Sequence, residues 1–279
     1  MATRILVAVV FVPLLLAVML LLPSIAWTAV VCLISAVASY ELMRATGEGK
    51  LTLPMQVVTI LSAAALPLGS WAGLGTAYVN LCSFLVMAVC FWCAIRAYDG
   101  YSTPVGFVQV LVCLFGGVIV PLALAALVEL RCMEYGKYLV LFAVLLAFVT
   151  DAGAYFTGVF LGKHRGVTRV SPNKSVEGYI GGFAAGVVFA ILYGLVITEM
   201  ARSSASLLTL ALSGLLGAAA TEVGDLAFSF VKRQYGVKDF GHILPGHGGM
   251  LDRFDSMLFC APVVLFIVRF LPVFSGVGQ

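Results

Sequence analysis

The chain has 279 residues, of which 62% are hydrophobic and only 10% are charged, and its mean hydropathy is +1.10. Soluble domains contain about 45–50% apolar residues, so this composition excludes an ordinary soluble fold. The formal net charge of +3 says little by itself, because the position of the cations matters more than their sum.

Long apolar runs follow one another along most of the chain. A run of about 20 apolar residues can span a bilayer as a helix. We therefore expect an all-α polytopic integral membrane protein with about nine transmembrane helices in one integral domain. The predicted spans are residues 5–22, 25–43, 54–71, 77–95, 107–128, 138–160, 178–198, 206–228 and 256–272.

The first predicted span partly resembles a signal peptide, because Arg4 precedes an apolar run that ends near Pro23. The run from Ile5 to Leu22 is longer than the roughly 7–15 residues of a signal-peptide core. We expect the segment to be retained as a membrane helix. The short N-terminus without a transit peptide favours a bacterial plasma (inner) membrane.

Basic residues are distributed unequally between the two sides of the predicted membrane domain. With nine spans, the N-terminus and the loops after even-numbered spans share one side, which carries 12 of the 16 basic residues. The positive-inside rule predicts that this side is cytoplasmic. These residues are Arg4, Arg44, Lys50, Arg96, Lys163, Arg165, Arg169, Lys174, Lys232, Arg233, Lys238 and Arg253; the opposite side has Arg131, Lys137, Arg202 and Arg269.

All seven cysteines lie in or at the ends of apolar segments. Cys90 and Cys93 form a CxxC pair, but it lies inside a predicted helix without a second pair or a nearby histidine. This favours small apolar packing residues over a redox or zinc site, and it implies no disulfide framework.

Polar residues change their distribution near residue 145. Before it they are scattered, and after it three polar blocks fall on the predicted cytoplasmic side. We therefore expect residues 1–145 to form a transmembrane scaffold and residues 146–279 to form a catalytic half.

The first polar block contains Asp151 and Tyr155, which are four residues apart and share one helix face. A carboxylate in an apolar span needs a partner, water or a metal ion. A structural hydrogen bond between helices is the alternative to a place in an active site.

The second block runs from Ser171 to Gly178 and reads Ser-Pro-Asn-Lys-Ser-Val-Glu-Gly. Ser175 is expected to cap the following helix, whose N-terminal N–H groups and dipole favour an anion. Lys174 adds a formal charge there, although a solvated loop would have a similar composition. Gly178, Gly182 and Gly186 at four-residue spacing indicate a close helix-packing face.

The third block centres on the signature segment, residues 229–255. It holds four cations, three carboxylates and two histidines in 27 positions. Glu222, Asp225, Ser229 and Lys232 share one helix face upstream, and Gly246-His247-Gly248-Gly249 permits close backbone approach to a phosphate. Carboxylates facing a basic loop favour a divalent metal and a polyphosphate. A loop that contacts anionic lipid headgroups would explain the cations but not the aspartates.

These motifs resemble those of the phosphatidate cytidylyltransferases, also called CDP-diacylglycerol synthases. Their signature reads Ser-x-apolar-Lys-Arg, four residues, Lys-Asp, then Pro-x-His-Gly-Gly-apolar-x-Asp-Arg-apolar-Asp, and every fixed position is filled here. The family also carries Asp-x-x-Ala-Tyr and Ser-Pro-x-Lys-Thr/Ser-x-Glu-Gly where the first two blocks stand. The resemblance is strong over about residues 145–260.

The resemblance implies that CTP and phosphatidate give CDP-diacylglycerol and pyrophosphate at the cytoplasmic face, with Mg²⁺ required and a second cation allowed. Membrane lipid is then a partner, nucleic acid is not, and the sequence is compatible with a homodimer. Asp225 and Asp252 are the expected metal ligands. The expected catalytic set is Asp225, Lys232, Arg233, Lys238, Asp239, His247, Asp252, Arg253 and Asp255, and the expected substrate-binding set is Asp151, Tyr155, Ser171, Lys174, Ser229, Gly248 and Gly249.

The chain departs from the family pattern at Phe228, where a glutamate is common. We expect Phe228 to be a packing residue on the lipid-facing flank of the site, with Glu222 as a candidate substitute for the missing carboxylate.

Two other functions stay open at this point. A CTP-dependent polyprenol or phytol kinase would have similar acidic and basic loops, but it would transfer the γ-phosphate. A secondary anion transporter would also carry intramembrane carboxylates, but near the midplane and in matching halves.

Overall fold

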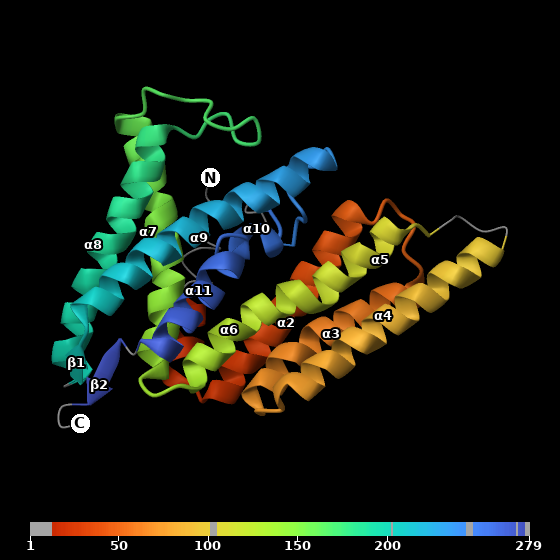
Figure 1. Ribbon diagram of the computed structural model, residues 1–279, viewed down its shortest axis with the longest axis horizontal. Helices are drawn as coiled ribbons and strands as arrows, with labels where there is room; N and C mark the ends of the chain where they lie inside the picture. Colours follow the sequence, from red (N-terminus) through yellow and green to blue (C-terminus); the bar gives the residue numbers. More distant parts are fainter. Residues whose placement is uncertain (1–12, 101–104, 202, 244–247, 272, 277–279) are drawn as a thin grey trace. The chain divides into compact units, whose positions relative to one another are not determined.

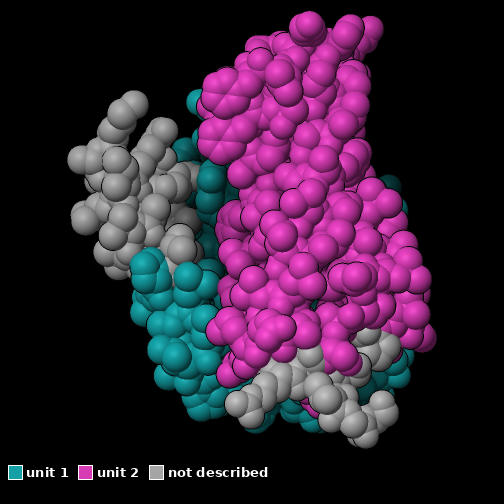
Figure 2. Space-filling model, turned by 90° about the vertical axis from the view of Figure 1, so that its left-hand side faces the viewer, with its two compact units in different colours: residues 1–132, 234–254 teal, residues 133–233, 255–279 magenta. Residues whose placement is uncertain are grey.

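The computed structural model describes residues 13–100, 105–201, 203–243, 248–271 and 273–276. Their contacts divide the chain into two compact units, coloured separately in Figure 2. Unit 1 comprises the chain up to Cys132 together with Gln234–Phe254, and unit 2 comprises Met133–Arg233 and the chain from Asp255 onward. Most of the signature segment therefore packs with the N-terminal helices. The predicted division into a scaffold, residues 1–145, and a catalytic half, residues 146–279, stays a prediction.

Helices make up most of the described structure, which confirms the all-α polytopic class. Seven helical segments are long and apolar enough to span a membrane. They are α2 (Ser24–Thr46), α3 (Leu53–Trp71), α4 (Gly75–Asp99), the segment Phe107–Cys132, α7 (Gly136–Phe160), α8 (Val176–Ala201) and α9 (Leu207–Gln234).

The two remaining predicted spans differ from the other seven. Residues 5–12 of the first, 5–22, lie outside the described residues, and residues 13–21 are helical. The last, 256–272, forms α11 (Met257–Phe270) of 14 residues, a length of about 21 Å at 1.5 Å per residue. Because the hydrocarbon core is about 30 Å thick, α11 is short for a full span, and the count of about nine stays a prediction.

Unit 1 contains α2, α3, α4, the segment Phe107–Cys132 and the short α10 (Leu251–Phe254). The segment Phe107–Cys132 consists of α5 (Phe107–Leu114), the π-helical turn η1 (Phe115–Ile119) and α6 (Val120–Cys132). Ser39 donates a hydrogen bond to the carbonyl of Gly116, and Ser62 donates one to that of Gly117 at 2.8 Å. Side chains from α2 and α3 thus satisfy carbonyls where the helical register changes.

Unit 2 contains α7, α8, α9 and α11, with α7 and α8 side by side (Figure 1). Glycines on α8 allow this contact: a Cβ at Gly182 would lie 3.2 Å from the Thr150 carbonyl, and one at Gly178 would lie 3.0 Å from the Ala154 carbonyl. The predicted glycine packing face is confirmed. A two-stranded antiparallel pair, β1 (Ser203–Ala205) with β2 (Phe274–Gly276), was not expected from the sequence.

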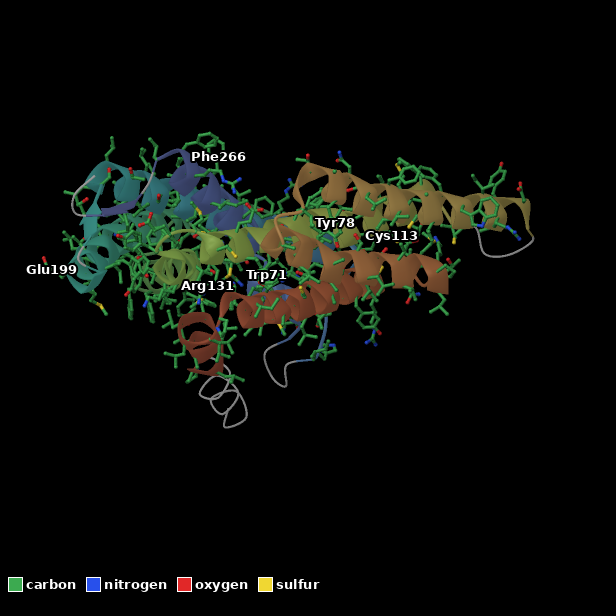
Figure 3. The ribbon with its side chains drawn as sticks, turned by 90° about the horizontal axis from the view of Figure 1, so that it is seen from below. Trp71, Tyr78, Cys113, Arg131, Glu199 and Phe266 are labelled. Atoms are coloured by element: carbon green, nitrogen blue, oxygen red, sulfur yellow. The ribbon has the colours of Figure 1, made fainter. Side chains whose placement is uncertain are left out.

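Large apolar side chains are exposed on helices of both units, as expected for surfaces that face lipid. Leu61 of α3 is 63% exposed and Leu208 of α9 is 72% exposed. Phe266 of α11 is 65% exposed and points outward in Figure 3. All seven cysteines are free, as predicted.

Candidate active site

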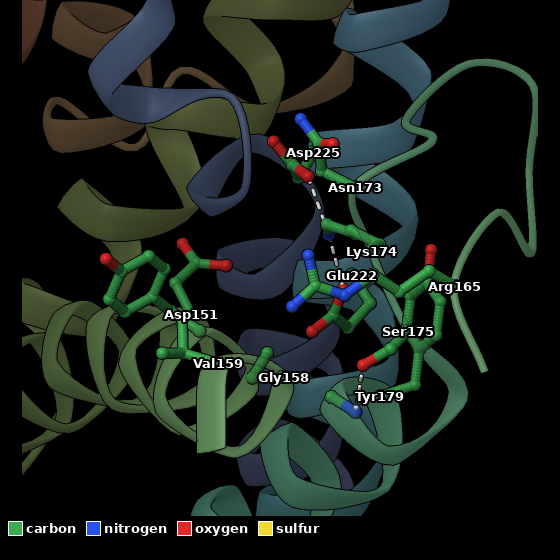
Figure 4. Close-up of a pocket in the computed structure, with 13 residues that line it drawn as sticks. Asp151, Gly158, Val159, Arg165, Asn173, Lys174, Ser175, Tyr179, Glu222 and Asp225 are labelled. Atoms are coloured by element: carbon green, nitrogen blue, oxygen red, sulfur yellow. Dashed lines mark hydrogen bonds and ion pairs between the residues drawn. The ribbon is translucent and has the colours of Figure 1, made fainter. Parts of the chain in front are cut away.

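A cavity of about 390 Å³ that contains a cluster of charged side chains lies in unit 2 at one end of α7 and α8 (Figure 4). Its walls come from α7, from the loop before α8, from the first turn of α8 and from the middle of α9. This volume falls in the range of small-molecule sites, about 300–1,000 Å³. The lining residues are Asp151, Ala154, Tyr155, Gly158, Val159, Arg165, Asn173, Lys174, Ser175, Gly178, Tyr179, Glu222 and Asp225.

Lys174 lies at the centre of the charges in this cavity. Its Nζ is 2.6 Å from Glu222 Oε2 and 2.6 Å from Asp225 Oδ2 (Figure 4). The side chains are 23%, 4% and 28% exposed respectively, so the three charges are largely removed from water. Two carboxylates from one face of α9 thus meet a cation from the loop before α8.

The surroundings of Lys174 keep it protonated. Burial disfavours its charge, but the carboxylates of Asp225 and Glu222 outweigh this effect and hold the pKa of Lys174 above its usual value. Its Nζ also lies 5.3 Å from the centre of the Tyr179 ring. The lysine is therefore a fixed positive charge at neutral pH.

The N-terminus of α8 is ordered by two side chains. Ser175 Oγ accepts a hydrogen bond from the backbone N–H of Gly178 at 3.1 Å, which confirms the predicted cap. Glu177 accepts hydrogen bonds from the backbone N–H groups of Lys163 and His164, each at 3.2 Å, and its Oε1 lies 2.6 Å from the His164 ring. These contacts hold the start of the loop between α7 and α8 against the first turn of α8.

Asp151 and Asp255 lie near the junction of α7, α9 and α11 within unit 2. Asp151 Oδ2 accepts a hydrogen bond from Ser256 Oγ at 3.1 Å. Asp255 Oδ1 accepts one from the backbone N–H of Ser256 at 2.8 Å, and its Oδ2 lies 3.9 Å from Lys232 Nζ. Both Asp151 and Asp255 thus have identified partners.

Unit 1 holds a second group of predicted residues around Asp252. Asp252 Oδ2 accepts hydrogen bonds from the backbone N–H groups of Phe240 at 2.8 Å and Gly249 at 3.1 Å. Gly248 has a φ of 85°, which L side chains rarely adopt. A Cβ there would lie 3.3 Å from Asp239 Oδ1 and 3.4 Å from Asp252 Oδ2. Gly248 thus adopts an unusual dihedral close to two carboxylates, whereas the predicted close approach of this backbone to a phosphate stays a prediction.

The structure brings four predicted site residues into the cavity: Asp151, Tyr155, Lys174 and Asp225. Other predicted residues belong to unit 2 but do not line it, namely Ser171, Ser229, Lys232, Arg233 and Asp255. Six belong to unit 1, namely Lys238, Asp239, Gly248, Gly249, Asp252 and Arg253. His247 lies outside the described residues.

Nine of the thirteen lining residues were absent from the predicted site sets, among them the polar residues Arg165, Asn173 and Glu222. Glu222 was considered only as a substitute for the glutamate missing at position 228, yet it is 3% exposed and contacts Lys174. Its Oε1 is buried and has no hydrogen-bond partner among the described residues. The sequence feature that could have identified Glu222 as a site residue is its position as a carboxylate inside an apolar span.

Phe228 is a packing residue, as predicted. The prediction that it lies on the lipid-facing flank of the site is wrong. Its side chain is 2% exposed, and its ring meets that of Phe259 edge-on with centroids 6.5 Å apart. The position next to Asp225 on α9 is therefore filled by an aromatic contact with α11 inside unit 2.

Comparison with known proteins gives the family. The model of the Cytidylyltransferase family matches residues 2–271, nearly the entire chain. This chain belongs to the cytidylyltransferase family. The membership does not favour a lipid kinase or an anion transporter.

Bacterial relatives carry the name phosphatidate cytidylyltransferase. The protein of that name from Bacillus subtilis is 42% identical over 142 residues, which are 50% of this chain and 51% of the relative. The one from Thermotoga maritima is 42% identical over 143 residues, 50% and 52% of the two chains. The one from Staphylococcus aureus (strain COL) is 44% identical over 133 residues, 46% and 48% of the two chains. In these alignments the chain spans about half the length of each curated relative.

Proposed function

We propose that this protein transfers the cytidylyl group of CTP to phosphatidate and releases pyrophosphate. The observation that carries the proposal is the ion-pair cluster of Lys174, Glu222 and Asp225 in a cavity of a membrane-embedded cytidylyltransferase. In the reaction, a phosphate oxygen of phosphatidate forms a bond to the α-phosphorus of CTP. The bond from the α-phosphorus to the oxygen bridging to the β-phosphate breaks, and that oxygen leaves with pyrophosphate.

The side chains of the cavity suit this chemistry because it needs little proton transfer. A phosphate monoester is mostly dianionic near neutral pH, so the attacking group requires no strong base. Catalysis then depends on positioning and on neutralising negative charge. Lys174 and Arg165 supply positive charge in the cavity, and the first turn of α8, the positive end of the helix dipole, lines the same region.

The cavity residues fit a divalent cation. Glu222 and Asp225 are hard oxygen donors of the kind that Mg²⁺ prefers, and Glu222 Oε1 is buried without a partner among the described residues. A bound Mg²⁺ would neutralise phosphate charge in the transition state. Among the residues that the structure describes, no group of three or more His, Cys, Asp or Glu side chains forms a ready metal site. Asp252 as a further ligand, and the second cation, rest on the signature alone.

We further propose that the protein resides in a bacterial plasma membrane with its cavity at the cytoplasmic face. The support is the distribution of basic residues and the bacterial origin of the relatives. CTP would arrive from the cytosol and phosphatidate sideways from the bilayer. A homodimer stays a prediction from the sequence.

The test uses purified protein in liposomes with two differently labelled forms of CTP. Cytidylyl transfer puts the label of [α-³²P]CTP into a lipid product and that of [γ-³²P]CTP into pyrophosphate, and both require phosphatidate. A lipid kinase would instead put the γ-label into the lipid. Absence of any lipid-bound α-label with folded protein, phosphatidate and Mg²⁺ present would refute the proposal.

A further inference from the structure

A buried carboxylate of the N-terminal helices holds one end of the signature segment. Glu41 lies near the C-terminal end of α2 and is 2% exposed. Its Oε2 accepts a hydrogen bond from the backbone N–H of Leu251, the first residue of α10, at 2.8 Å. Its Oε1 is buried and has no hydrogen-bond partner among the described residues. Both residues belong to unit 1.

The same carboxylate explains two glycines of the signature segment. A Cβ built at Gly249 would lie 2.6 Å from Glu41 Oε2, and one built at Gly241 would overlap the Glu41 carboxylate. Gly241 and Gly249 are not among the residues with a positive φ. They therefore serve to leave room for Glu41 rather than to permit a left-handed backbone.

The segments that enclose Glu41 also hold Asp252. Phe240, next to Gly241, donates its backbone N–H to Asp252 Oδ2, and so does Gly249. Glu41 accepts the N–H of Leu251, the immediate neighbour of Asp252. The two carboxylates thus accept hydrogen bonds from backbone N–H groups in two described stretches of one loop, residues 240–241 and 249–251.

We propose that Glu41 is a positioning residue that fixes the backbone of this loop and thereby the orientation of Asp252. This inference rests on the proposed function, in which Asp252 is a Mg²⁺ ligand. Residues that orient a metal ligand typically change metal affinity or activity about 10–100-fold when they are replaced. Glu41 acts on Asp252 through the backbone of the loop. Its loss should therefore raise the Mg²⁺ concentration that the enzyme requires, and it should change the affinity for CTP at saturating Mg²⁺ less.

The first experiment compares Glu41→Ala and Glu41→Gln with the unchanged protein, using hydrogen–deuterium exchange without metal or substrate. Alanine removes the acceptor, so the amide of Leu251 should exchange about tenfold faster or more, the equivalent of one lost hydrogen bond. Glutamine keeps an acceptor oxygen and should restore most of the protection. Glu134→Ala, which removes an exposed carboxylate, is the matched control and should leave this loop unchanged.

The second readout is the Mg²⁺ concentration that gives half-maximal formation of the lipid product. It should rise about tenfold or more in Glu41→Ala and stay within about twofold in Glu41→Gln. A role in stability alone would lower the amount of folded protein without moving this constant. If Glu41→Ala does not fold, Glu41→Asp retracts the carboxylate by one methylene and is expected to show both effects in weaker form.

A double substitution tests the contact itself. Gly241→Ala should speed exchange of the loop in the presence of Glu41, but it should add little in the Glu41→Ala background, because the three atoms nearest to the new Cβ all belong to Glu41. Unchanged exchange in Glu41→Ala, or equal effects of Gly241→Ala in both backgrounds, would overturn the inference. Hydrogen–deuterium exchange does not depend on turnover. If the protein without substitutions were inactive, the proposed function would be refuted, but the exchange experiment would still test the role of Glu41.

Discussion

Replacing Lys174 by methionine should destabilise unit 2 strongly. Methionine keeps most of the aliphatic length but removes the charge that neutralises Glu222 and Asp225, which lie 2.6 Å from Nζ. Removing one partner of a buried ion pair costs about 3–5 kcal/mol, because the remaining charge stays buried and unpaired. Lys174 and Asp225 are 23% and 28% exposed, so we expect the lower end of that range, about 3 kcal/mol.

The loss is measured as thermal unfolding in detergent micelles, where about 3 kcal/mol corresponds to roughly 6–12 °C for a chain of this size. Lys163→Met is the matched control, since Lys163 is an exposed lysine of the same loop and its replacement should change stability by less than about 0.5 kcal/mol. The double variant Lys174→Met with Glu222→Gln removes the buried partner charge as well and should recover part of the loss.

The pH dependence gives a further check. The folded pKa of Lys174 is raised, so its contribution to stability is fully present below the unfolded pKa and is lost only as the pH rises through the folded pKa. Titration of Lys174 itself should therefore add no pH dependence to the stability of the unchanged protein below the unfolded pKa of lysine, about 10.4. Equal melting of Lys174→Met and Lys163→Met, with no recovery in the double variant, would refute the ion-pair cluster.

Four further outcomes are expected. Asp225→Asn and Asp252→Asn should each abolish turnover in folded protein across a Mg²⁺ titration, and near-normal rates in either variant would remove that residue from the metal site. Phe228→Leu should keep most activity, whereas Phe228→Ala should cost about 3–5 kcal/mol of stability; equal loss of activity in Phe228→Leu and Asp225→Asn would contradict the packing role. A single cysteine at Gln234, in a background without native cysteines, should resist an impermeant thiol reagent until cells are opened, and labelling of intact cells would reverse the topology. CTP binding without phosphatidate, measured by equilibrium dialysis, should strengthen markedly when Mg²⁺ is added; equal binding with and without metal would argue against a metal-bound nucleotide.

The membrane helices could be predicted from composition because burial in lipid requires an apolar side chain at almost every position. Seven predicted spans correspond to long helices of the structure. The π-helical turn at Phe115–Ile119 could not be predicted in the same way. It depends on hydroxyl groups of Ser39 and Ser62 that lie 77 and 55 residues away in sequence and satisfy displaced carbonyls.

The candidate site could be predicted in its residue types but not in its pairings. Lys174 was expected to bind substrate through its charge, but its ion pairs with Glu222 and Asp225, 48 and 51 residues later in the chain, were not predicted. Glu41 was missed because the polar residues before residue 145 looked scattered. A carboxylate inside an apolar span is costly unless it has partners, and its partner at Leu251 is 210 residues away.

With the proposed function, the charges that line the cavity predict that a metal ion is needed for more than the chemical step. The lining contains three carboxylates, Asp151, Glu222 and Asp225, and only two basic side chains, Arg165 and Lys174. Both carboxylates nearest to Lys174 already use its charge, so little positive potential remains for a triphosphate. Opposite charges a few ångströms apart interact far more strongly in a largely buried site than in water, and the same holds for repulsion between carboxylates and phosphates. A cation that arrives with the nucleotide would offset this repulsion, and Lys174 would then be free to exchange a carboxylate oxygen for a phosphate oxygen. The metal requirement should consequently already appear in CTP binding, before phosphatidate is present.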